Sequence, residues 1–62
     1  MDLLTETEVA GILKVKSATL RTWRTRGEGP GFVKLGRAVR YQREVLEAWI
    51  TSRSFSNTHQ AA

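Results

Sequence analysis

Apolar residues recur at helical spacing near the start of the chain. Val9 and Leu13 lie one turn apart with no proline or charged residue between them, which predicts an amphipathic helix over residues 6–13. Thr5 and Glu8 stand at the spacing of a capping box, in which each side chain binds the other residue's free backbone N–H group. The pattern therefore predicts the first helix and the residue at which it starts.

A second helix is predicted over residues 17–26. Leu20 and Trp23 form its narrow apolar stripe. Gly27 follows as a residue that can end a helix in the left-handed conformation without a Cβ penalty. Only residues 14–16 separate the two helices. Two short helices joined by three residues predict a helix-turn-helix.

Residues 32–35 and 39–41 are short runs of apolar and aromatic residues, with one basic residue in each, and predict the two strands of an antiparallel hairpin. A three-residue loop over 36–38 would gather the apolar side chains on one face and the basic ones on the other. A two-residue loop would mix them on both faces. The pattern therefore favours the three-residue loop. The expected pairs are Leu35 with Val39, Lys34 with Arg40 and Val33 with Tyr41.

A third helix is predicted over residues 43–52, where apolar residues fall at positions i, i+1, i+4 and i+5. From residue 54 onward the chain is polar and has no periodicity, so we expect a disordered tail over 54–62. Residues 1–53 then form one α+β domain. The predicted fold is a small winged helix-turn-helix, with three short helices and a two-stranded antiparallel hairpin as the wing.

Charge is distributed unevenly along the chain. Nine of the ten Lys and Arg residues lie between positions 14 and 43, where Glu28 is the one acid, and the net charge is +4. This balance favours an anionic partner, although a basic run alone is more often a solvated face. The chain contains no cysteine and one histidine, so disulfides and structural zinc are excluded as supports for a thin core. We expect no cofactor and a bound partner.

The helix over residues 17–26 carries small and basic side chains on the face opposite Leu20. It has three arginines and no acid, whereas an exposed helix is commonly stabilised by pairs of opposite charge. Small residues allow a helix to approach a groove closely. Arginine reaches the acceptors of guanine or of a phosphate. This face is therefore the expected major-groove surface of a double-stranded DNA-binding protein.

The hairpin supplies a second group of basic residues. In the favoured register Lys34 and Arg40 repel one another until an anion lies between them, and Arg37 stands at the loop tip, where a thin basic hairpin could enter or straddle the minor groove. We expect the two regions to bind DNA together. The predicted contacts are Lys16, Ser17, Ala18, Arg21, Thr22, Arg24, Thr25, Arg26, Lys34, Gly36, Arg37 and Arg40.

Other functions are less well supported by the residues present. The chain has no nucleophile–base pair, metal-ligand cluster or phosphate loop, so we expect no enzymatic activity. Glu6 and Glu8 suit the positive end of the first helix dipole, which is a structural role. Trp23 and Trp49 lie on apolar stripes and favour core packing over stacking on unpaired bases. No apolar run approaches the roughly 20 residues that span a bilayer, so a cytoplasmic location without membrane contact is expected.

The residues above resemble the excisionase and AlpA-like branch of the MerR-type winged helix-turn-helix proteins over residues 3–51. The resemblance implies that the helix over 17–26 enters the major groove and that the wing lies along the adjacent backbone or minor groove. Two positions depart from the family pattern. Lys16 stands where Ser commonly caps the recognition helix, which shifts its start to Ser17, and Gln42 stands where Ser or Pro is common. The matching residues are Leu4-Thr5, Glu8-Val9-Ala10, Leu13, Val15, Thr19-Leu20, Trp23, Gly27, Pro30, Lys34-Leu35-Gly36-Arg37, Val39-Arg40-Tyr41 and Leu46-Glu47-Ala48-Trp49-Ile50.

The resemblance implies two functions. The first is a recombination directionality factor, an architectural protein that binds repeated sites, bends DNA and assists an integrase in excision. The second is a compact transcription regulator of the same fold. A rival of another class is an interaction adaptor whose basic face meets an acidic protein. We expect no effector domain and no long coiled coil, so the first function is favoured. We then expect a monomer in free solution, with neighbouring copies on DNA and a cognate integrase as candidate partners.

Overall fold

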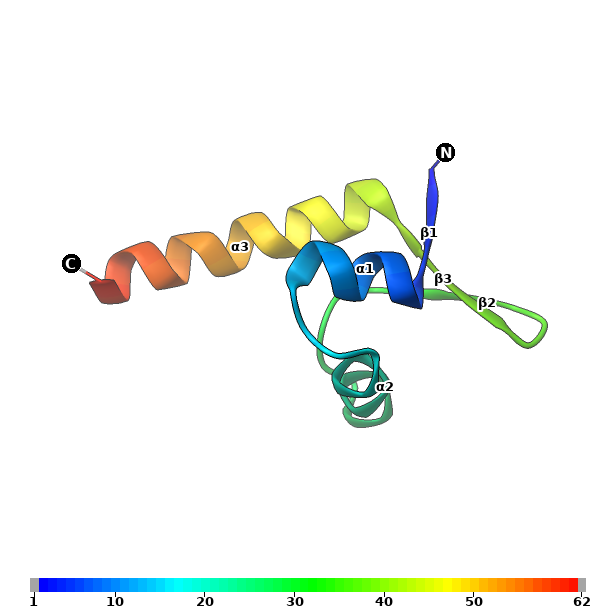
Figure 1. The fold of residues 1–62 in the computed structure, drawn as a ribbon. Helices are drawn as coiled ribbons and strands as arrows, with labels where there is room; N and C mark the ends of the chain where they lie inside the picture. Colours follow the sequence, from blue (N-terminus) through cyan, green and yellow to red (C-terminus); the bar gives the residue numbers. More distant parts are fainter. Residues whose placement is uncertain (1, 62) are drawn as a thin grey trace.

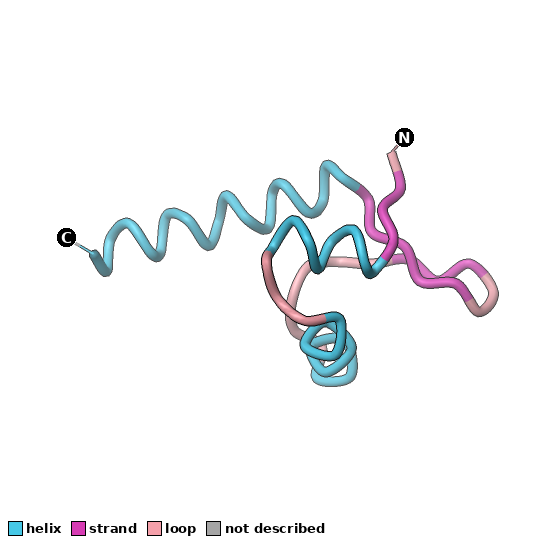
Figure 2. Tube along the Cα trace, in the orientation of Figure 1, coloured by secondary structure: helices cyan, strands magenta, loops and turns pink. Residues whose placement is uncertain are grey.

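The structure is a computed structural model that describes residues 2–61, with side chains described as far as residue 53. The helices and strands follow the predicted order, with one additional strand before the first helix (Figure 1, Figure 2). The protein has the α+β architecture of a small winged helix-turn-helix. Its elements are β1 (Leu3–Thr5), α1 (Glu6–Leu13), α2 (Ser17–Arg26), β2 (Val33–Leu35), β3 (Ala38–Gln42) and α3 (Arg43–Ala61).

The two helices of the helix-turn-helix begin and end as predicted. At the start of α1, the Thr5 hydroxyl accepts a hydrogen bond from the backbone N–H of Glu8 (3.1 Å), and the Glu8 carboxylate accepts one from the N–H of Thr5 (2.8 Å). Helix α2 starts at Ser17, and the Lys16 side chain before it makes no capping hydrogen bond. Gly27 ends α2 with a positive φ of 73°. The local residue types therefore set the start of α1 and the end of α2, whereas α1 ends at Lys14, which takes the left-handed conformation (φ 58°) without being a glycine.

The sheet has three antiparallel strands in the order β1-β3-β2, so the predicted hairpin gains a third strand. Leu4 in β1 pairs with Tyr41 in β3. A three-residue strand that ends on the capping residue Thr5 is too short to give a periodic signal. Strand β1 forms because it pairs with a strand that lies far along the sequence. The added strand ties the N-terminus to the base of the wing.

The wing, defined here as β2, β3 and the turn between them, has a two-residue loop of Gly36 and Arg37. The predicted three-residue loop is wrong. The observed pairs are Val33 with Arg40, Lys34 with Val39 and Leu35 with Ala38. They replace the predicted pairs of Leu35 with Val39, Lys34 with Arg40 and Val33 with Tyr41.

The geometry of the turn and the burial of β3 side chains in the core set this register. The separation of apolar from basic side chains on the two faces of the hairpin, on which the prediction relied, does not. Gly36 has a φ of 65° and Arg37 has no positive φ, which is the pattern of a type II′ turn, whose twist matches that of a hairpin. On β3, Tyr41 is fully buried and Val39 packs against the core. Strand β2 then lies mostly in solvent, and Leu35 remains 54% exposed.

The core lies between α1, α2, the start of α3 and one face of the sheet. Its buried side chains are Leu4, Val9, Ala10, Leu20, Tyr41 and Leu46. Trp23 packs against this core, and half-buried Trp49 packs against Trp23 with ring centroids 5.8 Å apart. The expected core role is confirmed for Trp23, whereas Trp49 reaches the core through its contact with Trp23.

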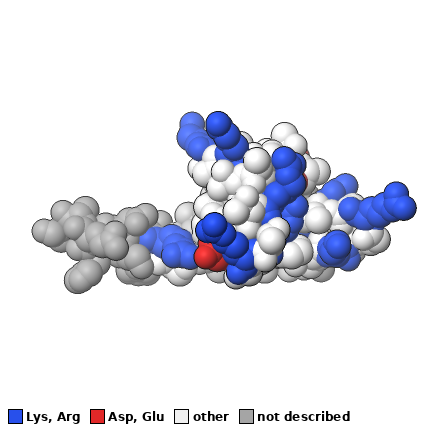
Figure 3. Space-filling view, turned by 90° about the horizontal axis from the view of Figure 1, so that it is seen from below, with Lys and Arg blue, Asp and Glu red and all other residues white. Residues whose placement is uncertain are grey.

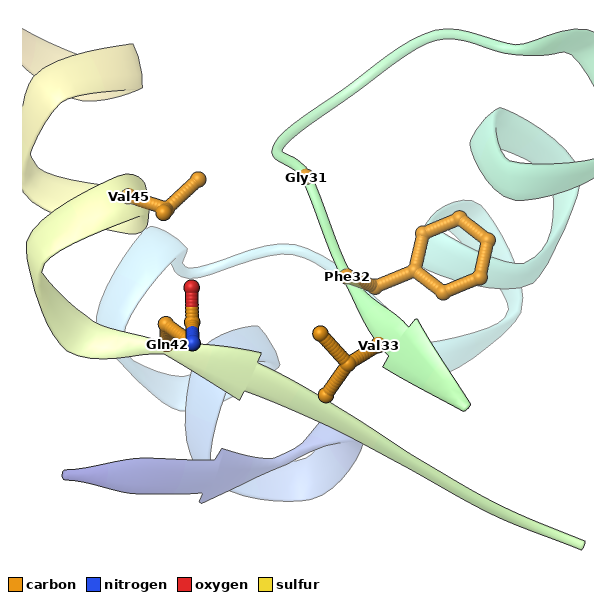
Figure 4. A pocket seen from close by; sticks show the side chains of 5 residues that line it. All are labelled: Gly31, Phe32, Val33, Gln42 and Val45. Carbon is orange, nitrogen blue, oxygen red and sulfur yellow. The ribbon is translucent and has the colours of Figure 1, made fainter. Parts of the chain in front are cut away.

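A small hollow of about 110 Å³ opens at the base of the wing, beside the start of α3 (Figure 4). Its lining is largely apolar and comes from the loop before β2, from β2 itself, from the end of β3 and from α3. The lining residues are Gly31, Phe32, Val33, Gln42 and Val45.

Helix α3 continues to Ala61, beyond the predicted end at residue 52. Its start is fixed by Arg43, whose backbone N–H donates to the Asp2 carbonyl (3.0 Å) and whose guanidinium donates to the Asp2 carboxylate. This hydrogen bond raises the pKa of Arg43 above its ordinary value. The side chains of residues 54–61, and residue 62, lie outside the described part of the chain. The predicted domain end at 53 and the disordered tail over 54–62 therefore stay predictions.

Candidate nucleic-acid interface

Helix α2 presents the face that its sequence predicts. Leu20 is 1% exposed and faces the core, whereas Ala18, Thr22 and Thr25 are exposed on the other side. In Figure 1, α2 stands at the lower edge of the molecule, with no other element beneath it. Its small outer residues can therefore approach a partner without rearrangement of the fold.

The basic residues gather on this same side of the molecule. Figure 3 views the protein from below, so that α2 lies nearest to the viewer and the wing extends to the right. Blue Lys and Arg side chains are spread over the middle of this face and along the wing, with white areas between them and one small red area near the lower edge. The visible charge favours a long anionic partner lying across both regions.

The wing carries its charges on both faces. Lys34 and Arg37 are exposed, and among the residues that the structure describes no acid forms an ion pair with either. Arg40 is half-buried and donates a hydrogen bond to the Val39 carbonyl (2.8 Å). Because Lys34 pairs with Val39, it lies on the face opposite Arg40. The predicted repulsion between these two cations is therefore wrong, and each can meet a separate phosphate.

Two open hollows separate the wing from the helices. The α2–wing hollow, of about 340 Å³, is lined by Arg21, Arg24, Thr25, Phe32, Lys34 and Val39. The α1–wing hollow, of about 390 Å³, is lined by Thr5, Glu6, Thr7, Arg24, Arg37, Ala38, Val39 and Arg40. Both contain basic side chains and open to solvent. They provide concave basic surfaces next to α2 on one side and next to the start of α1 on the other.

Arg24 stands between the two hollows and is already bound within the protein. Its Nη1 donates to Glu6 Oε1 (2.8 Å) and to the Tyr41 hydroxyl (2.8 Å), and its guanidinium lies over the Phe32 ring at 5.7 Å. The side chain is 17% exposed. Burial lowers its pKa, but the hydrogen bonds and charges of Tyr41 and Glu6 outweigh this and raise the pKa above its ordinary value. Arg24 thus joins α1, α2 and β3.

The sequence carries a signal for this role. At 100° per residue, Arg24 lies about 40° from Leu20, towards the core side of α2. Residue type alone places it with the outer arginines. Its position on the helix indicates a side chain that spans the domain.

Arg21 is the exposed partner of the same carboxylate. Its Nη1 donates to Glu6 Oε2 (3.0 Å), and its side chain is 59% exposed. Sequence reasoning assigned Glu6 to the helix dipole and missed this contact, because the contact depends on how α1 crosses α2. Arg21 lines the α2–wing hollow, so its remaining donors are open to a ligand.

The other predicted contacts fall at the ends of these elements. Lys16 and Ser17 lie at the start of α2, Arg26 lies in its last turn, and Gly36 lies in the wing turn. Most of the predicted set is thus on or beside the basic face. The exposed members are Lys16, Ala18, Arg21, Thr22, Thr25, Arg26, Lys34, Gly36 and Arg37, and the half-buried members are Ser17, Arg24 and Arg40.

Comparison with known proteins agrees with this geometry. No helix among the described residues has the length and apolar character needed to cross a membrane. No curated protein and no solved structure gives a significant match. The family of helix-turn-helix domains matches residues 3–54, from β1 into α3. This match supports binding of double-stranded DNA. The chain belongs to the helix-turn-helix domain family.

Proposed function

We propose that the protein is a sequence-specific architectural DNA-binding protein of the excisionase type, which binds repeated sites and bends DNA to assist an integrase. The observation that supports this best is that one side of the molecule carries both the exposed face of α2 and the exposed basic residues of the wing. A helix in the major groove reads base edges, and a basic hairpin holds the adjacent backbone or minor groove. The two surfaces together suit a duplex that is gripped at more than one groove.

Within this proposal the residues have distinct roles. Ala18 and Thr22 allow α2 to approach the floor of the major groove, and Arg21 reaches a base edge or a nearby phosphate. Lys34 and Arg37 bind backbone phosphates, which fixes register without reading sequence. Arg24 acts from within the domain by holding α2 against α1 and β3.

The small size of the interface favours action on repeated sites. One domain with a few base contacts gains little specificity alone, and lateral contacts between copies bound head-to-tail could supply the rest. The protein would then be a monomer in free solution and cooperative on DNA. A compact transcription regulator uses the same surfaces on a single site, so the number of repeats needed for tight binding distinguishes the two functions.

DNA binding is tested first by its salt dependence. With roughly five cations reaching phosphates, log K against log salt should have a slope of about −4 to −5, at about −0.9 per phosphate. Arg37→Ala should make the slope shallower by about one. The matched control is Arg53→Ala, which removes one charge from α3 beside Trp49 and should leave the slope unchanged. A flat slope for the wild-type protein would support the adaptor hypothesis.

The architectural role is tested on duplexes with one, two and three copies of a site selected from a random pool. We expect binding per site to strengthen with the number of copies, and circular-permutation gel shifts to show bending. Footprints with and without a candidate integrase then test recruitment. Independent binding to each copy, or a stable dimer in sedimentation of the free protein, would favour the transcription regulator.

A further inference from the structure

Glu6 is the one acid that binds the arginines of α2 in the described part of the chain. Each carboxylate oxygen takes a different partner, with Oε1 bound to Arg24 and Oε2 bound to Arg21. The Glu6 side chain is 21% exposed. It therefore lies at the boundary between the interior, where Arg24 is held, and the exposed surface, where Arg21 is held.

Capping of α1 does not require this side chain. The two capping hydrogen bonds of the helix come from Thr5 and Glu8, and Arg24 keeps a second partner in the Tyr41 hydroxyl. A carboxylate at position 6 also places negative charge beside a surface that otherwise attracts an anion. Such a charge lowers the affinity for any DNA. Its stabilising effects on the α1 dipole and on Arg24 do not require the second contact, from Oε2 to Arg21, so that contact brings a separate gain.

The gain lies in the orientation of Arg21. This side chain is held through a single nitrogen, so the other donors of its planar guanidinium stay free. A free arginine loses considerable rotamer freedom when it binds a base edge, and a side chain that is already restrained loses less. The guanidinium fork must also meet its acceptors in one orientation to distinguish one base from another.

We propose that Glu6 is a positioning residue, which holds Arg21 in the orientation that discriminates between bases and lowers the affinity for unrelated DNA. This inference rests on the proposed function. It assigns to a single carboxylate the two means by which a protein gains specificity, namely better contacts to the right partner and a penalty against wrong ones.

The test compares two duplexes, one selected from a random pool by the wild-type protein and one scrambled duplex of equal composition. Glu6→Gln should bind the scrambled duplex more tightly. The ratio of affinities for the selected and scrambled duplexes should fall by roughly threefold to tenfold, within the range of couplings between neighbouring side chains. The control Glu47→Gln makes the same charge change at an exposed site on α3 and should keep the ratio.

A second variant separates orientation from charge. Glu6→Asp keeps the net charge, but its shorter side chain cannot reach both arginines in the same way. It should lower the ratio without strengthening the binding of scrambled DNA. In an Arg21→Ala background neither change at position 6 should alter the ratio. Circular dichroism of each variant confirms that the fold is retained.

The outcomes separate this inference from the function on which it rests. If the wild-type protein selects no duplex, both are overturned. If it selects a duplex and Glu6→Gln leaves the ratio unchanged, or strengthens binding to both duplexes in proportion, Glu6 does not position Arg21 and the DNA-binding function stands. An effect of Glu6→Gln that persists in the Arg21→Ala background would also overturn the inference.

Discussion

The helix-turn-helix and the wing are built by different means. Helix α2 is held by the buried Leu20, by the capped helix α1 and by the ion pairs of Glu6. The outer part of the wing is held by a two-residue turn and its strand pairing, and Leu35 near its tip is 54% exposed. Reading base edges requires a fixed orientation, whereas binding phosphates requires mainly charge and reach. The part that would read sequence is the part that the core holds in place.

The largest expected effect comes from removing a side chain that fixes α2. Leu20→Ala leaves a cavity in a small core, and deletions of this kind cost about 2–5 kcal/mol. Thermal unfolding followed by circular dichroism should show a domain that is largely unfolded at room temperature. Leu35→Ala, the matched change on the wing, should shift the midpoint little. A similar loss for both variants would contradict the contrast between the two regions.

Arg24→Ala should be the next most damaging change. It leaves the buried Tyr41 hydroxyl without its donor and removes one of the two partners of Glu6. Loss of hydrogen bonds to charged groups costs about 1.5–3 kcal/mol. Urea unfolding should report this loss, whereas Arg21→Ala should alter stability little and DNA affinity strongly. If Arg24→Ala weakens DNA binding without lowering stability, Arg24 belongs to the contact surface as first predicted.

Gly29 tests how tightly the end of α2 is held, and Gly11 in α1 provides the contrast. A Cβ at Gly29 would lie 2.8 Å from Trp23 Cε3, and the residue has a φ of 81°. Gly29→Ala should cost about 1–2 kcal/mol through strain and close contact. A Cβ at Gly11, on the exposed side of α1, meets nothing within 4 Å. Gly11→Ala should therefore stabilise the domain, by up to about 1 kcal/mol. Differential scanning calorimetry of the two variants should show midpoints that move in opposite directions.

The same contrast explains which features could be predicted from the sequence. The start of α1 and the end of α2 follow from local chemistry, since Thr5, Glu8 and Gly27 act on backbone groups within a few residues. The outer face of α2 follows from helical periodicity. The register of the wing does not follow from the sequence pattern, because the pairing of Lys34 depends on the type of turn and on the burial of Tyr41.

Contacts between distant segments were also beyond the sequence patterns. Strand β1 and the pairing of Glu6 with Arg21 each join residues far apart in the chain. Neither leaves a periodic trace, and a carboxylate in a first turn is already explained by the helix dipole. The exposed positions of the candidate interface residues were therefore predictable, whereas their contacts with residues far along the chain were not.

The smallest expected effect concerns Lys16, where stability and binding are opposed. The N-terminal position before α2 lacks a side-chain cap, so Lys16→Ser should supply one and stabilise the domain by about 1 kcal/mol or less. The same change removes a cation that is predicted to contact DNA. We expect a higher unfolding midpoint and a salt slope shallower by up to about one. Lys14→Ser is the control, because it removes a charge from the turn between the helices without placing a hydroxyl at this cap. If Lys16→Ser raises stability and leaves the salt slope unchanged, the basic surface begins within α2 rather than before it, and the first contact of the recognition helix is not Lys16.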